Sequence, residues 1–97
     1  ENFSSIAHIT FKNLYEQSNK LNLKPVVQLG IYRKENIAGQ FFEELYFPNL
    51  INKWEVGDSI PAQSILLANL NYLPPVEKEK LKKINIDLPE YALWVTK

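Results

Sequence analysis

The sequence contains no cysteine and no methionine, and it has only one histidine and three glycines among 97 residues. Without cysteine, neither a disulfide framework nor a zinc–thiolate site can form, and this absence favours a reducing compartment. His8 alone cannot build a two-histidine metal site or a Cys–His pair, and no serine has a nucleophile-elbow sequence around it. The glycines are too dispersed for a phosphate-binding loop. We therefore expect no metal, no cofactor and no enzymatic activity.

The sequence also has no excess of charge of either sign, because eleven basic residues balance eleven acidic ones. Because the sequence has no surplus of basic residues, it does not indicate a nucleic acid or an anionic membrane as the partner of this segment. No apolar run approaches the ~20 residues that a membrane-spanning helix needs. The chain begins at Glu1 and lacks methionine, which predicts a segment of a longer protein. A hydrophobic content of 45% supports one core, so we expect residues 1–97 to form a single domain.

The spacing of apolar residues predicts an α+β domain with a mainly antiparallel sheet and helices packed on it. We expect helices at residues 11–21, 61–73 and 76–83, and strands at residues 3–9, 26–33, 41–47 and 91–97. The short loop between the second and third strands predicts an antiparallel hairpin. One contiguous core is expected from Val27, Leu29, Ile31, Phe41, Leu45, Leu66, Leu70 and Trp94.

Two charged residues fall on the apolar sides of that expected hairpin. Alternation places Arg33 beside Ile31, and Glu43 between Phe41 and Leu45. Burying an ionised group costs several kcal/mol unless the group is paired. Both residues could lie at sheet edges or pair with each other. Alternatively, they could form a polar site in a cleft, where the guanidinium of Arg33 binds an anion through two hydrogen bonds.

The run "LNLKPVVQLGIYRKENIAGQFFEELYFP" resembles the core of the UTRA domain, the effector-binding domain of bacterial GntR-type transcription regulators of the HutC branch. The matching positions are Arg33, Glu43, Tyr46 and Pro48. "SIPAQSILLANLNY" is similar to the helix that follows in that family, and "VEKEKLKKINIDLPEYALWVTK" is similar to its charged helix and next strand. The sequence departs from the family at Ile31, where a second arginine is common. The segment between Leu23 and Val26 is also shorter, and family members continue into two more strands.

The resemblance implies a chorismate lyase-like fold and a cytoplasmic, homodimeric regulator that senses a small anionic metabolite, such as a sugar phosphate or an organic acid. Arg33 would hold the anionic group, Glu43 a hydroxyl or amine, and Ser64 would add a hydroxyl, with Tyr46 as a further ligand-binding residue. DNA contact would belong to a separate winged-helix domain. Two alternatives stay open: a chorismate-lyase-like enzyme acting on a carboxylated substrate, and a non-catalytic protein-interaction domain.

Overall fold

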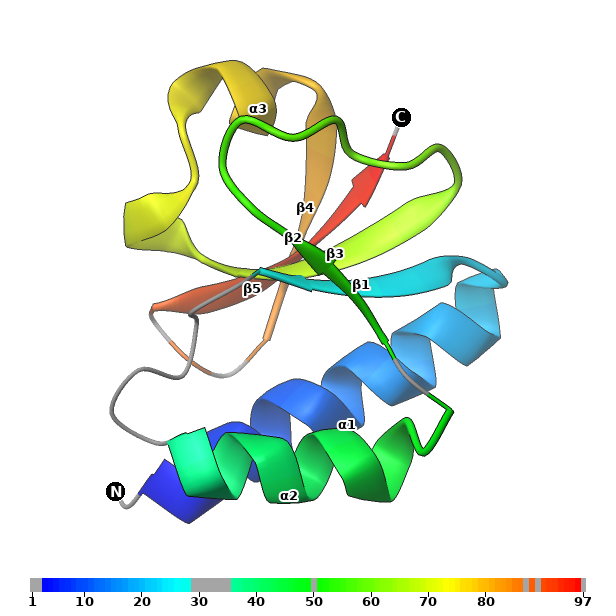
Figure 1. The fold of residues 1–97 in the computed structure, drawn as a ribbon. Coiled ribbons are helices and arrows are strands. Elements are labelled where there is room, and N and C mark those ends of the chain that lie inside the picture. The colour runs from blue at the N-terminus through cyan, green and yellow to red at the C-terminus, as the bar shows by residue number, and fades with distance from the viewer. Residues whose placement is uncertain (1–2, 29–35, 50, 87, 89, 97) are drawn as a thin grey trace.

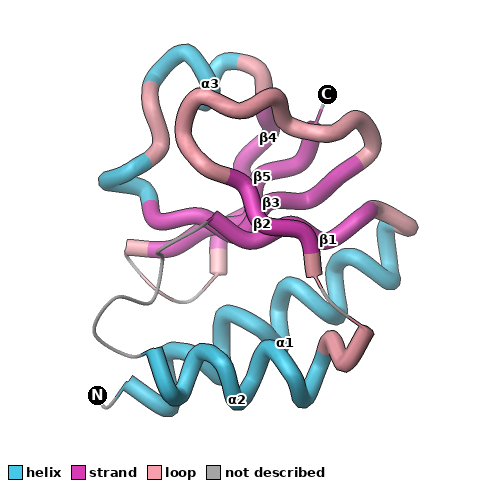
Figure 2. Tube along the Cα trace, in the orientation of Figure 1, coloured by secondary structure: helices cyan, strands magenta, loops and turns pink. Residues whose placement is uncertain are grey.

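The computed structural model describes residues 3–28, 36–49, 51–86, 88 and 90–96, and five strands in them form one sheet. Helices α1 and α2 lie on one side of the sheet, whereas α3 and the segment before β3 lie on the other (Figures 1 and 2). The elements in chain order are α1 (Phe3–Leu21), β1 (Lys24–Gln28), α2 (Asn36–Tyr46), β2 (Asn52–Trp54), β3 (Ser64–Asn69), the 3₁₀ turn η1 (Leu70–Tyr72), α3 (Pro75–Glu79), β4 (Leu81–Asn85) and β5 (Tyr91–Thr96).

The sheet is mixed, with the strand order β2-β1-β3-β5-β4. Strand β1 pairs in parallel with β2 and β3, through three and four paired positions. Strand β5 pairs antiparallel with β3 and β4, through five positions each. The expected α+β class and the mainly antiparallel sheet are therefore confirmed. The parallel pair β1–β2 is joined through α2, because parallel neighbours need a crossover rather than a hairpin.

Helix α1 is longer than the predicted helix and includes residues 3–9, so the strand predicted there is wrong. Ala7, Phe11 and Leu14 are fully buried, and their i, i+4, i+7 spacing forms the stripe that packs on the sheet. The Thr10 hydroxyl donates to the Ala7 carbonyl at 2.8 Å inside the helix. Tertiary packing of this stripe outweighs the weak local preference of the segment for a strand.

The end of α1 follows the hydrogen-bond pattern of a Schellman motif. The Leu23 N–H donates to the Ser18 carbonyl at 3.0 Å, and the Asn22 N–H donates to the Asn19 carbonyl at 3.4 Å. Asn22 has φ of 55°, the left-handed conformation that asparagine tolerates better than most residues. This turn reverses the chain into β1, where Pro25 lies close to the start.

Helix α2 replaces the strand predicted at residues 41–47, so the expected hairpin is wrong. The reason is visible in the spacing: residues 41 and 45, and residues 42 and 46, form two apolar i, i+4 pairs with the two glutamates between them. The strand interpretation made Glu43 an anomaly, which the helix removes. Pro48 follows the last turn, where the Phe47 N–H still donates to the Glu43 carbonyl at 2.8 Å.

The helix predicted at residues 61–73 is also wrong, because Ser64–Asn69 is the central strand β3. All six of its residues are buried, and a strand covered on both faces carries a continuous apolar run that periodicity cannot distinguish from a buried helix. The predicted helix at 76–83 is confirmed only in α3, since β4 begins at Leu81. Strand β5 confirms the prediction for the C-terminal segment.

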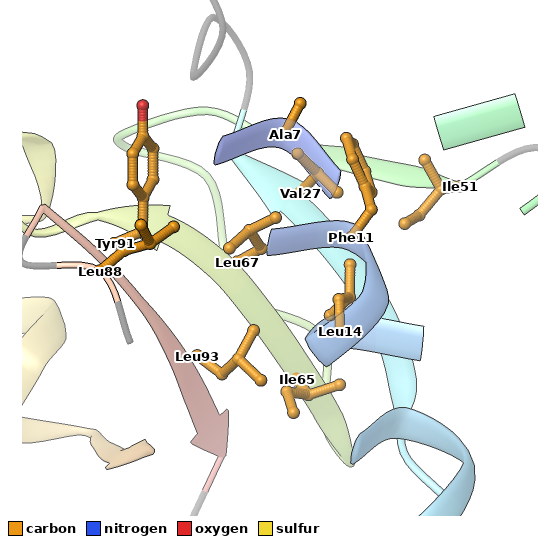
Figure 3. Close-up of a cluster of buried hydrophobic side chains, with 10 residues drawn as sticks. All are labelled: Ala7, Phe11, Leu14, Val27, Ile51, Ile65, Leu67, Leu88, Tyr91 and Leu93. Atoms are coloured by element: carbon orange, nitrogen blue, oxygen red, sulfur yellow. The ribbon is translucent and has the colours of Figure 1, made fainter. Parts of the chain in front are cut away.

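The sheet has an apolar cluster on each face, so the core is not the single set that was predicted. Figure 3 shows the cluster under α1, which contains Ala7, Phe11, Leu14, Val27, Ile51, Ile65, Leu67, Leu88, Tyr91 and Leu93. The second cluster contains Val26, Trp54, Leu66, Ala68, Leu73, Leu81, Ala92 and Trp94. The alternation of Ile65, Leu66, Leu67 and Ala68 between the clusters follows the pleat of β3.

The predicted core residues fall into four groups. Val27, Leu66 and Trp94 are buried as expected, although Val27 belongs to one cluster and the other two to the opposite one. Leu70 is partly buried against the second cluster. Leu29 and Ile31 lie outside the described residues. The prediction is wrong for two residues of α2, Phe41 and Leu45, which are 60% and 58% exposed.

Candidate functional site

The four residues proposed for ligand binding have different structural roles. Arg33 lies outside the described residues. Glu43 is on α2 and forms an ion pair with Lys53 of β2, on the helix-covered side of the sheet. Both side chains are partly exposed, so this pair contributes at most about 1 kcal/mol to stability. Glu43 is thus engaged with a surface lysine, and its role in recognising an effector stays a prediction.

Ser64 is the first residue of β3, not a first-turn residue of a helix as predicted. It is fully buried, and its hydroxyl donates to the Pro61 carbonyl at 2.5 Å. Its backbone N–H donates to the Thr96 hydroxyl at 3.0 Å, which ties β3 to β5. These bonds join the ends of two core strands, so no helix N-terminus accompanies Ser64.

Tyr46 lies at the end of α2 and faces α1, where it forms an aromatic group with His8 and Phe42. The imidazole of His8 stacks on Phe42 with ring centroids 4.7 Å apart and planes within 4°. The His8 Nε2 atom also shares a hydrogen bond of 2.8 Å with the Tyr46 hydroxyl. The exposed histidine therefore bridges two residues one turn apart on α2.

The ring contacts continue in both directions from this group. Towards the interior, Tyr46 packs on Tyr15 at 5.5 Å, Tyr15 contacts Phe47 at 5.9 Å, and Phe47 contacts the buried Phe11 at 6.4 Å. Towards solvent, Phe42 meets Phe41 edge to face at 5.0 Å. Such offset and edge contacts contribute about 0.5–1.5 kcal/mol each beyond the area that they bury.

Three exposed apolar residues of α1 and α2 define a surface that we call the α1–α2 face. Phe41 and Leu45 are one turn apart on α2 and are 60% and 58% exposed, and Tyr15 of α1 is 41% exposed. Exposed polar residues surround the three: Gln40 and Glu44 on α2, and Lys12 and Glu16 on α1. A contiguous apolar surface with a polar rim is typical of an interaction site.

The described residues were compared with the side-chain groupings that hold metal ions or activate a serine. Within that part of the chain, no three His, Cys, Asp or Glu side chains converge on a possible metal site. The hydroxyls of Ser18 and Ser64 donate to backbone carbonyls, and His8 shares its hydrogen bond with the Tyr46 hydroxyl, so neither of these two serines is bonded to the histidine. No helix among these residues has both the length and the apolar character to cross a bilayer.

Comparison with family models, with curated proteins and with solved structures gave no match for this chain. The resemblance to the UTRA domain and the chorismate lyase-like arrangement therefore stay predictions.

Sequence reasoning missed the α1–α2 face because it assigned Phe41 and Leu45 to the core of a strand. The signal that could have found the face is the presence of two neighbouring i, i+4 apolar pairs in "FFEELY", since a helix packed on one side can bury only one of them.

Proposed function

We propose that this domain is a non-catalytic assembly module in which the α1–α2 face pairs with the same face of a second copy. The observation that carries the proposal is the exposed Phe41–Leu45 stripe, which continues through ring contacts into the core. Anchored aromatic residues are the side chains that dominate binding at interfaces, because they lose little rotamer freedom there.

The charges around the face favour a second copy as its occupant. Lys12 and two glutamates, Glu16 and Glu44, provide both signs, so a two-fold arrangement can bring opposite charges together. The whole chain has a formal net charge of zero, and two copies are therefore not held apart by long-range repulsion. An acidic or basic partner would gain no general attraction from this surface.

The size of the face sets the expected strength of the dimer. From their exposed fractions, the three apolar side chains present roughly 300 Å², well below the ~800 Å² per partner of a standard interface. We therefore expect a reversible dimer with a dissociation constant of about 10–100 µM.

The test is sedimentation equilibrium of the wild type and of two variants, Phe41→Ala and Leu45→Ala. Each substitution removes exposed apolar surface and should weaken the dimer about tenfold or more, while the fold stays intact. Val76→Ala is the matched control, because Val76 is also 60% exposed but lies on α3, on the other side of the sheet. A wild type that stays monomeric at 1 mM, or equal weakening by Val76→Ala, would contradict the proposal.

A further inference from the structure

A second surface feature, a groove of about 480 Å³, lies on the side of the sheet away from α1 and α2. Its walls come from segments far apart in the sequence: the loop at residues 57–62, the C-terminal part of α3, and the ends of β4 and β5. A volume of this size falls in the range of small-molecule sites. The lining residues used below are Asp58, Ile60, Glu77, Lys80, Leu81 and Thr96.

Hydrogen bonds to the core hold the loop wall of the groove in place. The indole Nε1 of the buried Trp54 donates to the Asp58 carbonyl at 2.9 Å. The Asp58 N–H donates to the Glu55 carbonyl at 2.9 Å and closes a turn, in which Gly57 has φ of 106°. Side chains disfavour the conformation of Gly57, so a glycine is needed at this position of the turn. A wall that is ordered in advance lowers the cost of binding.

The groove combines three charges with an apolar floor. Asp58 and Glu77 supply two carboxylates, and Lys80 supplies one ammonium group. In the described part of the chain, none of these three side chains forms an ion pair with another residue, although the Asp58 Oδ2 atom accepts a hydrogen bond from the Glu55 N–H at 3.3 Å. Leu81 and Ile60 belong to the second apolar cluster or pack against it, so they form the floor.

An unpaired donor lies beside this floor. Trp94 packs in the same cluster as Leu81, and it precedes Thr96 by two residues on the same face of β5. The Trp94 Nε1 atom is buried and has no hydrogen-bond partner among the described residues. A buried donor without an acceptor is uncommon and costs about 1–3 kcal/mol. Trp94 does not line the groove itself, so this donor is a feature of the cluster beneath the groove.

We infer that the groove binds a basic amino acid. Such a ligand carries two cationic groups, one carboxylate and an aliphatic stem, which match in number and kind the two carboxylates, the ammonium group and the apolar floor. Asp58 and Glu77 bind the cationic groups, Lys80 binds the ligand carboxylate, and the stem lies on Ile60 and Leu81. The inference is independent of the proposed dimer, because the groove and the α1–α2 face lie on opposite sides of the sheet.

The test is titration of the ¹⁵N-labelled chain with L-arginine, followed by amide chemical shifts. We expect saturable shifts at residues 57–62 and 77–81, and a binding constant at least about fivefold weaker in Asp58→Asn and in Glu77→Gln. Glu90→Gln, which removes an exposed carboxylate outside the groove lining and outside the α1–α2 face, should leave binding unchanged. Agmatine, which is arginine without its carboxylate, should bind more weakly than arginine to the wild type.

The variant Lys80→Gln distinguishes specific recognition of the ligand carboxylate from unspecific attraction of cations to Asp58 and Glu77. In this variant, arginine should no longer bind more tightly than agmatine, because the ammonium group that binds the ligand carboxylate has been removed. The inference would be overturned if arginine produced no saturable shifts at 50 mM. It would also be overturned if glucose 6-phosphate or citrate bound more tightly than arginine, or if Lys80→Gln left the preference for arginine intact.

Discussion

At the scale of single residues, burial in the structure separates leucines that look alike in the sequence. Leu67 of β3 is fully buried in the cluster under α1, whereas Leu45 of α2 is 58% exposed. The sequence predicted Leu45 as a core residue and did not include Leu67. The difference is set by the neighbouring elements: β3 is covered on both faces of the sheet, and α2 is covered only on the side that faces α1.

This difference gives a paired stability prediction. Leu67→Ala should lower the free energy of unfolding by about 2–5 kcal/mol, because it removes buried methyl groups and leaves a cavity. Leu45→Ala should change it by less than about 0.5 kcal/mol, as is usual for surface positions. Urea denaturation at a protein concentration below about 0.5 µM, where a dimer with the expected dissociation constant is largely dissociated, measures both values. Equal losses in the two variants would show that α2 packs differently.

At the scale of elements, the sequence predicted well where a local signal was decisive. The stripe of residues 11, 14, 18 and 21 gave most of α1, and the apolar run of residues 91–96 gave β5. The sequence-based prediction was wrong where the spacing of apolar residues fits both a strand and a helix. "FFEELYF" is short and aromatic like a strand and also repeats at i, i+4, and "SILLAN" is apolar at every position but its ends. Pairing across the sheet and packing on α1 decide these cases, and neither is visible locally.

The same ambiguity explains why the candidate site was only partly predicted. Glu43 and Tyr46 were selected from positions in a supposed strand, and Ser64 from a supposed helix start. In the folded chain, Tyr46 belongs to the aromatic array between α1 and α2, Glu43 pairs with Lys53, and Ser64 links two strands. A stretch of sequence shows which residues are polar, but it does not show which hydrogen-bond or ion-pair partners those residues have in the folded chain.

The turn after α1 offers a prediction about a single element boundary. Asn22 has positive φ, so Asn22→Ala should lower the free energy of unfolding by about 1 kcal/mol through backbone strain. Asn22→Gly should be neutral or slightly stabilising, because glycine adopts this conformation without steric cost. Thermal unfolding of the two variants, side by side, measures the difference. If alanine were as stable as glycine, the left-handed turn would not be present.

At the scale of the whole molecule, the sheet separates two surfaces of different character. The α1–α2 face is apolar with a mixed polar rim, and the groove on the opposite side is charged with an apolar floor. Each face of the sheet has its own buried cluster, so both surfaces rest on a packed layer. A dimer formed through α1 and α2 would therefore leave both grooves open to solvent.

The central claim is that Phe41 and Leu45 form the contact between two copies. The most direct measurement is an isotope-filtered NOE experiment on an equimolar mixture of ¹³C-labelled and unlabelled chains at about 1 mM. The account predicts intermolecular NOEs from the Phe41 ring and the Leu45 methyl groups. Intermolecular NOEs confined to another surface, such as the edge strand β4, or none at all, would contradict it.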